Sequence, residues 1–96
     1  MATYILLLRF TQQGVGDIKE SPAQIEAARQ AFRALGAELK AFYMVLGQYD
    51  AVMVVEAPDD ETAFTAALGM FSLGASTQTL RAFTEDEFRE IVAALP

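Results

Sequence analysis

The feature that most constrains the fold is a pair of apolar, β-prone segments separated by only two residues. Residues 38–46 and 49–57 flank Gly47 and Gln48, and glycine at the first central position is typical of a tight hairpin turn. We therefore expect two adjacent antiparallel strands in which Leu46 opposes Tyr49. This register places Phe42, Met44, Leu46, Tyr49, Ala51, Met53 and Val55 on one face, and Leu39, Ala41, Tyr43, Val45, Asp50, Val52 and Val54 on the other.

Both faces of this hairpin are apolar, whereas an antiparallel sheet with one face in water alternates between polar and apolar residues. Helices of the same chain can cover one face. The other face then requires a second layer, because a large exposed apolar sheet is a typical interaction surface. We predict that another copy of the chain supplies this layer, as a homodimer or a higher homo-oligomer, with two sheets stacked as a dimeric α/β barrel.

The remaining elements follow from apolar patterns and helix caps. Strands are predicted at residues 3–10 and 77–83. A helix over 22–35 begins at a capping box formed by Ser21 and Gln24, with Pro22 at the first helical position, and ends at Gly36. Two further helices begin after Asp59 and after the capping box of Thr84 and Glu87. We expect the helix after Asp59 to bury a stripe made of Phe64, Ala67, Leu68 and Phe71.

The resulting order is βαββαβ followed by a C-terminal helix. This is the ferredoxin-like α+β pattern, in which right-handed crossovers give an antiparallel sheet of order 4-1-3-2 with both main helices on one face. The chain length of 96 residues is that of one domain, and we expect residues 1–96 to form it.

Composition excludes several classes of function. The chain has no cysteine and no histidine, which removes thiol and imidazole chemistry and their metal sites. Its net charge of −6 disfavours nucleic acids and anionic membranes as partners. The acidic clusters at residues 59–61 and 85–87 fit helix N-termini, so we expect no metal and no cofactor. The apolar runs are too short to span a bilayer, and we expect a cytoplasmic protein.

Asp50 is the carboxylate most unlike its surroundings, because it opens the apolar strand that continues to Ala57. Tyr43 is its diagonal neighbour in the expected register, and strand order brings the end of the first strand to the same edge. A small-molecule site there would use Asp50 as acceptor or base, Tyr43 and Tyr49 as orienting phenols, and Arg9, Lys19 and Thr77 as further contacts. The alternative is structural: Asp50 accepts hydrogen bonds from turn amides, with Arg9 as its counter-ion, and Lys19 is a solvated charge.

The tetrapeptide Gly47-Gln48-Tyr49-Asp50 resembles the motif for which the GYD domain family is named. The similarity extends over nearly the whole chain and implies a dimeric α/β-barrel fold without an established activity. Its other segments are Lys19-Glu20-Ser21-Pro22, Ala34-Leu35-Gly36, Lys40-Ala41-Phe42-Tyr43, Glu56-Ala57-Pro58-Asp59-Asp60 and Thr79-Leu80-Arg81-Ala82-Phe83.

A weaker resemblance links the element order and the Gly-x-Tyr-Asp hairpin to the effector-binding domains of Lrp/AsnC regulators, which dimerise and bind small metabolites between subunits. It implies a small-molecule binding or sensor module that works as a homo-oligomer. The alternative is a cofactor-independent enzyme of isomerase or monooxygenase type, since such enzymes share this architecture. In that case Asp50 is the general base and Tyr43 the hydrogen-bond donor.

Overall fold

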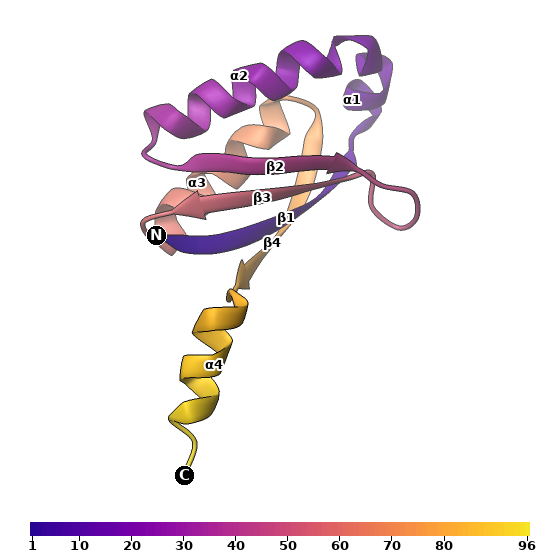
Figure 1. Cartoon of the computed structure of the whole chain (residues 1–96). Helices are drawn as coiled ribbons and strands as arrows, with labels where there is room; N and C mark the ends of the chain where they lie inside the picture. Colours follow the sequence, from indigo (N-terminus) through magenta and orange to yellow (C-terminus); the bar gives the residue numbers. More distant parts are fainter.

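The computed structural model describes residues 1–96 and has one four-stranded antiparallel sheet with helices α2 and α3 on the same face (Figure 1). The sheet order β2-β3-β1-β4 is the predicted 4-1-3-2 order taken from the opposite edge, so the predicted topology is confirmed. The predicted loop after the first strand instead contains a short helix and a 3-10 turn. The elements are β1 (Ala2–Phe10), α1 (Gln12–Gly16), η1 (Ile18–Glu20), α2 (Ser21–Ala34), β2 (Glu38–Met44), β3 (Ala51–Ala57), α3 (Asp60–Ser72), β4 (Ala75–Ala82) and α4 (Glu85–Ala93).

Alanine forms a large part of the core between the sheet and the two helices. The core contains 16 buried residues, and eight of them are alanine, at positions 28, 37, 51, 57, 63, 66, 67 and 75. The predicted buried stripe of α3 is wrong for three of its four residues. Phe64, Leu68 and Phe71 are between 56% and 61% exposed, while Ala63, Ala66, Ala67 and Met70 face the sheet. Small side chains on the inner face let the helix lie close to the strands, and the large ones point outward.

Helix ends confirm most of the predicted caps. The capping box of Thr84 and Glu87 is formed, and the Asp59 carboxylate accepts a hydrogen bond from the Thr62 N–H at 2.8 Å. Gly36, with φ of 87°, follows the end of α2. The box predicted for Ser21 is absent, because η1 runs directly into α2 and the Ser21 hydroxyl donates to the Ile18 carbonyl oxygen at 2.5 Å.

The hairpin between β2 and β3 is wider than predicted. The strands end at Met44 and begin again at Ala51, so residues 45–50 form a protruding loop in place of a two-residue turn. At the end of this loop the Asp50 backbone N–H donates to the Leu8 carbonyl oxygen of β1 at 2.8 Å. The Val45 N–H still donates to the Asp50 carbonyl oxygen at 3.1 Å, which closes the base of this loop.

The expected register between β2 and β3 holds only from Ala41 to Met44. An irregularity between Leu39 and Ala41 shifts the pairing by one residue, so Leu39 opposes Val55. A shift of one residue moves a side chain to the other face of a strand. Leu39 is therefore buried under the helices and does not lie on the face that the sequence pattern assigned to it.

A close approach of two glycines holds the start of α1 against the turn before β4. The Thr11 N–H donates to the Gly74 carbonyl oxygen at 2.8 Å. A Cβ atom added to Gly14 would lie 2.0 Å from that same oxygen, and Gly74 itself has φ of 88°. Only glycine fits at Gly14, and the contact fixes the chain where it leaves the end of β1.

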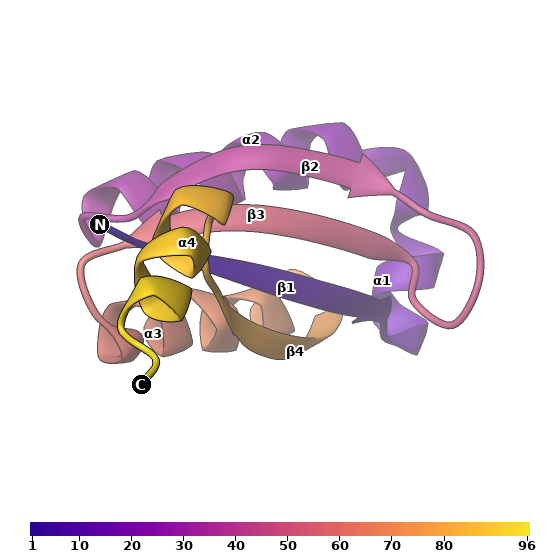
Figure 2. The ribbon, with the colours of Figure 1, turned by 60° about the horizontal axis from the view of Figure 1, so that its bottom comes forward.

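The second face of the sheet carries no helix of this chain (Figure 2). Both central strands contribute half-buried apolar side chains to it, and α4 leaves the end of β4 on this same side (Figures 1 and 2). None of the helices is long and apolar enough to cross a membrane. We call this surface the open face; its apolar members include Ile5, Leu7, Ala41, Val52 and Val54.

Candidate functional site

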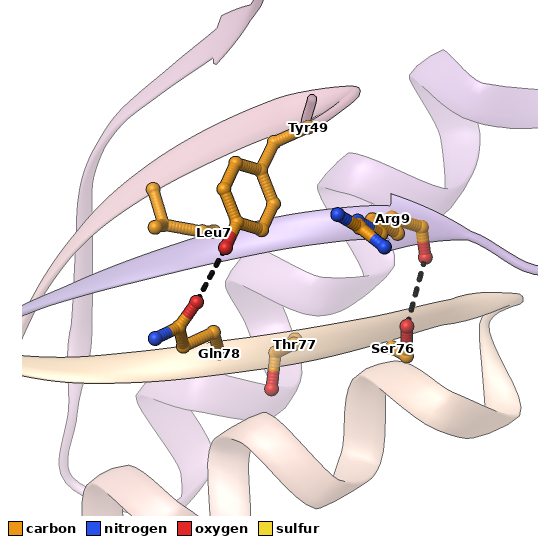
Figure 3. Close-up of a pocket in the computed structure, with 6 residues that line it drawn as sticks. All are labelled: Leu7, Arg9, Tyr49, Ser76, Thr77 and Gln78. Atoms are coloured by element: carbon orange, nitrogen blue, oxygen red, sulfur yellow. Dashed lines mark hydrogen bonds between the residues drawn. The ribbon is translucent and has the colours of Figure 1, made fainter. Parts of the chain in front are cut away.

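A shallow cavity of about 270 Å³ lies at the end of the open face where β1 and β4 pair (Figure 3). Pairing places Leu7 opposite Gln78 and Arg9 opposite Ser76, so alternate residues of both strands share one face. Tyr49 of the protruding loop reaches over the same strands. We call this the edge site; it is lined by Leu7, Arg9, Tyr49, Ser76, Thr77 and Gln78.

Arg9 and Tyr49 organise the edge site. The Arg9 guanidinium carbon lies 5.2 Å from the centre of the Tyr49 ring, within the range of a cation–π contact. The Arg9 Nε–H donates to the Gln48 carbonyl oxygen at 3.1 Å, which fixes one side of the guanidinium. The Tyr49 hydroxyl donates to Gln78 Oε1 at 2.5 Å, which ties the loop to β4.

The positive charge of Arg9 has no carboxylate partner in the folded chain. Ion pairs within 4.0 Å involve Arg29, Lys40 and Arg89 only. Nε is the one side-chain nitrogen of Arg9 that makes a hydrogen bond in the structure, so both terminal guanidinium nitrogens remain free to donate. A guanidinium fork in this state suits a carboxylate or another planar anion.

The Asp50 carboxylate accepts a hydrogen bond from the backbone of β1. Pairing of β1 with β3 stops at Leu8 and Ala51, and two residues further along β1 the Phe10 N–H donates to Asp50 Oδ2 at 2.8 Å. The carboxylate thus takes the place of a backbone carbonyl at the end of the ladder. The bond goes to β1 and not to turn amides, and no ion pair joins Asp50 to Arg9.

The predicted site residues are only partly brought together. Arg9, Tyr49 and Thr77 line the edge site, whereas Asp50, Tyr43 and Lys19 line none of the four cavities of the chain. Tyr43 lies on β2, is 60% exposed and makes no hydrogen bond with Asp50. Lys19 lies in η1 and is exposed.

Sequence reasoning missed Leu7, Ser76 and Gln78. The signal for them was the pairing of β1 with β4, since Arg9 opposes Ser76 and Leu7 opposes Gln78. The predicted order already made these strands neighbours. Their register was needed to place the three side chains beside Arg9.

A second polar contact lies at the opposite end of β1. The buried Tyr4 hydroxyl donates to Asp60 Oδ1, at the start of α3, at 2.5 Å. This hydrogen bond raises the pKa of the Tyr4 phenol, and burial raises it further. The phenol is thereby held in its neutral form, so this contact anchors α3 to the sheet.

The chain is similar to one protein-family model, to a named bacterial protein and to a solved crystal structure. A family model described as the GYD domain matches residues 4–92. A protein of Thermus thermophilus named "Glutamine synthetase and cystathionine beta-lyase binding protein" is 39% identical over 84 residues, which are 85% of this chain and 88% of that protein. The crystal structure of TTHA0845 from Thermus thermophilus is similar with a TM-score of 0.55 and 29% identity, over 88% of this chain and 95% of that one.

The family match spans almost every element, from β1 to α4. The chain therefore belongs to the GYD domain family.

Proposed function

We propose that the protein is a binding module that works as a homodimer or higher homo-oligomer and holds a small carboxylate ligand at the edge site. The observation that carries this proposal is the unpaired Arg9 guanidinium beside Tyr49 and Gln78. We expect the module in the cytoplasm.

Charge and shape favour a small monocarboxylate as the ligand. The net charge of −6 repels polyanions, while Arg9, without an ion pair at the edge site, offers a local positive site for a single anionic group. The aromatic ring of Tyr49 and the side chain of Leu7 give the site an apolar wall. Ser76 and Gln78 add polar groups that can orient the rest of the molecule.

A second copy on the open face would complete the edge site. The cavity of about 270 Å³ is slightly below the ~300–1,000 Å³ of common ligand pockets, and it opens onto the uncovered face of the sheet. Two sheets packed face to face lie about 10 Å apart. That arrangement is the predicted dimeric α/β barrel, and it would enclose the ligand between subunits.

Ligand binding is tested by calorimetry with acetate, pyruvate and benzoate. At least one of these should bind saturably to the wild-type chain, and Arg9→Gln should weaken it by at least about ten-fold, because a charge-assisted bidentate contact is lost. Arg33→Gln is the matched control, since it removes the same charge from the exposed surface of α2. Equal affinities of the Arg9→Gln variant and the wild type would refute the site.

Self-association is tested by light scattering. The wild-type chain at micromolar concentration should have at least twice the 10.5 kDa mass of one copy. Val52→Asp places a charge in the centre of the open face and should shift the population to monomer. Val15→Asp makes the same change at an exposed position of α1 and should leave the mass unaltered. A wild-type monomer would contradict this part of the proposal.

A protein partner is a second candidate function, favoured by the protruding loop at residues 45–50. Leu46 at this loop is fully exposed, at 103% of its reference area, and an apolar side chain placed there suits insertion into a partner's pocket. The name of the Thermus relative suggests glutamine synthetase and cystathionine β-lyase as proteins to test. Binding of either enzyme should be lost in Leu46→Ser and retained in Leu35→Ser, whose leucine is half exposed at the end of α2. Retained binding by both variants would exclude this loop.

A further inference from the structure

The C-terminal helix α4 lacks a packing partner within its own chain. It has nine residues and none of them is buried. Its apolar side is formed by Phe88, Ile91 and Val92, with Leu95 two residues beyond its end, and Phe88 is 60% exposed. Isolated helices shorter than about 12 residues are marginal in water, so caps alone do not explain an ordered helix of this length. We infer that α4 packs against a surface outside its own chain.

A groove of matching chemistry lies on the outer side of α3. Phe64, Leu68 and Phe71 project from the helix and, with Thr77 and Thr79 of β4, line a cavity of about 330 Å³. The adjoining cavity is lined by Tyr4, Asp60, Ala63, Phe64, Thr79 and Arg81. We call the first cavity the α3–β4 groove.

The position of α4 prevents it from covering the α3–β4 groove of its own chain. The helices α2 and α3 lie behind the sheet, whereas α4 projects from the end of β4 on the open-face side (Figures 1 and 2). Only Phe83 and Thr84 connect β4 to α4, which is too short a link to pass around the sheet edge. In a copy seated face to face on the open face, α4, about 13 Å long, spans the roughly 10 Å between the sheets, so its end reaches the edge of the second sheet, where β4 is the edge strand and lines the α3–β4 groove.

Charge distribution favours the α3–β4 groove over the rest of the surface. The helix α4 carries Glu85, Asp86, Glu87 and Glu90 against Arg89, a net charge of −3 out of −6 for the chain. Residues 62–80 contain no charged side chain, so the lining of the α3–β4 groove itself presents no like charge to an acidic helix. The carboxylate in the adjoining cavity, Asp60, accepts a hydrogen bond from the Tyr4 hydroxyl and shares that cavity with Arg81. Arg81 follows residues 62–80 directly and has no ion pair within its own chain, which leaves a positive group at the end of the groove.

We propose that α4 of one copy docks in the α3–β4 groove of a second copy, and that the exchange is reciprocal within a closed homodimer. This inference rests on the proposed self-association through the open face. The docked helix covers the phenylalanine and leucine side chains that α3 leaves outside its own core. It also explains why a helix with three large apolar residues is present on a chain whose core it does not touch.

Disulfide trapping tests the docking, because the chain has no cysteine of its own. Separately purified Ile91→Cys and Leu68→Cys variants are mixed and oxidised. A disulfide requires Cβ atoms about 3.5–4.5 Å apart, so this pair should cross-link at least about ten-fold faster than a control pair of Glu90→Cys and Leu68→Cys. Glu90 lies on the opposite side of α4 from Ile91, Val92 and Leu95.

The outcomes separate this inference from the proposed self-association. Equal cross-linking of both pairs, with light scattering still showing a dimer, would refute the docking of α4 and leave the open-face interface intact. A monomer would refute both. A chain carrying both Ile91→Cys and Leu68→Cys should give only a two-chain product; a ladder of larger products or an internal disulfide would overturn the closed reciprocal arrangement.

Discussion

Replacement of Asp50 tests whether the carboxylate serves the fold. Asp50 Oδ2 accepts the Phe10 N–H at 2.8 Å in a partly buried position. A hydrogen bond to a charged group contributes about 1.5–3 kcal/mol, and an unpaired buried N–H has a similar cost. We therefore expect Asp50→Ala to lower the free energy of unfolding by about 2 kcal/mol.

The conservative variant Asp50→Asn separates the charge of the acceptor from its presence. The Asn side chain keeps a carbonyl oxygen for the Phe10 N–H, so the expected loss is only about 0.5–1 kcal/mol. For a chain of this size, 1 kcal/mol corresponds to about 4–8 °C in Tm. The Ala variant should therefore unfold about 8–16 °C below the wild type, and the Asn variant well above the Ala variant.

The assay is urea and thermal unfolding followed by circular dichroism at one fixed protein concentration. Asp17→Ala is the control, because the Asp17 side chain forms no cap hydrogen bond and its loss should change stability by less than about 0.5 kcal/mol. If Asp50→Ala is as stable as this control, Asp50 does not hold the end of β1 in the way described. Its conspicuous place in the sequence would then need a functional explanation.

Three further perturbations test other contacts. In urea unfolding, Gly14→Ala should destabilise the chain by about 1–3 kcal/mol, because the added Cβ would collide with the Gly74 carbonyl oxygen. Gly16→Ala is the control and should be neutral or slightly stabilising, because no atom lies within 4 Å of the added Cβ. Similar losses of stability in the two variants would refute the contact. Tyr4→Phe should lose about 1–2 kcal/mol at pH 7. The pKa of the Tyr4 phenol is higher in the folded chain than in the unfolded chain, where it is near 10. Its contribution to stability is therefore present below about pH 10 and is lost as the pH rises through the pKa of the folded chain. A wild-type Tm as insensitive to alkali as that of the Phe variant would contradict this. Hydrogen bonding from Thr62 lowers the pKa of Asp59, with the larger effect from the Thr62 hydroxyl and the smaller from its backbone N–H. The pKa of Glu87 is lowered mainly by its hydrogen bond from the Thr84 backbone N–H. The contributions of these two carboxylates to stability are present above their pKa values in the unfolded chain, near 4, and are lost as the pH falls through their lower pKa values in the folded chain. An Asp59→Ala/Glu87→Ala variant should therefore show a Tm that depends less on pH between about pH 5 and pH 2. An unchanged dependence would show that these caps do not cause the loss of stability in acid.

Local signals in the sequence predicted the elements and their order, because they depend on neighbouring residues. Thr84 with Glu87 and Asp59 with Thr62 form their caps within one helical turn. Gly36 ends α2 by its own backbone conformation. Such contacts are complete in a short segment of chain, and the strand order then follows from general rules of connection.

Side-chain orientation on α3 could not be predicted in the same way. The helix is apolar on both sides, so its periodicity does not distinguish the face with Ala63 and Met70 from the face with Phe64 and Leu68. The sheet decides between them, because it accepts small residues at close distance. The one-residue shift beside Leu39 likewise arises from pairing with β3 and leaves no mark in the local pattern.

The sequence predicted those edge-site residues that stand out by their own side chains. It did not predict the residues that join the site only through the register of strand pairing. Arg9 and Tyr49 were identified by charge and by the hairpin motif, and they do lie together. Ser76 and Gln78 become neighbours only through their pairing with Arg9 and Leu7. Asp50 was singled out as unusual in an apolar strand, but its partner, the Phe10 backbone, carries no side-chain signal.

The alanine-rich core limits the free energy that one copy can gain by folding alone, because a buried methyl group removes little apolar area from water. In the proposed dimer, the larger side chains of the open face, α3 and α4 would gain their burial from the second copy. Folding and assembly would then share one equilibrium governed by mass action. Each ten-fold dilution should reduce the apparent stability of such a dimer by about 1.4 kcal/mol, so a Tm that falls with dilution is expected, and the cellular concentration of the chain would set how much of it is folded.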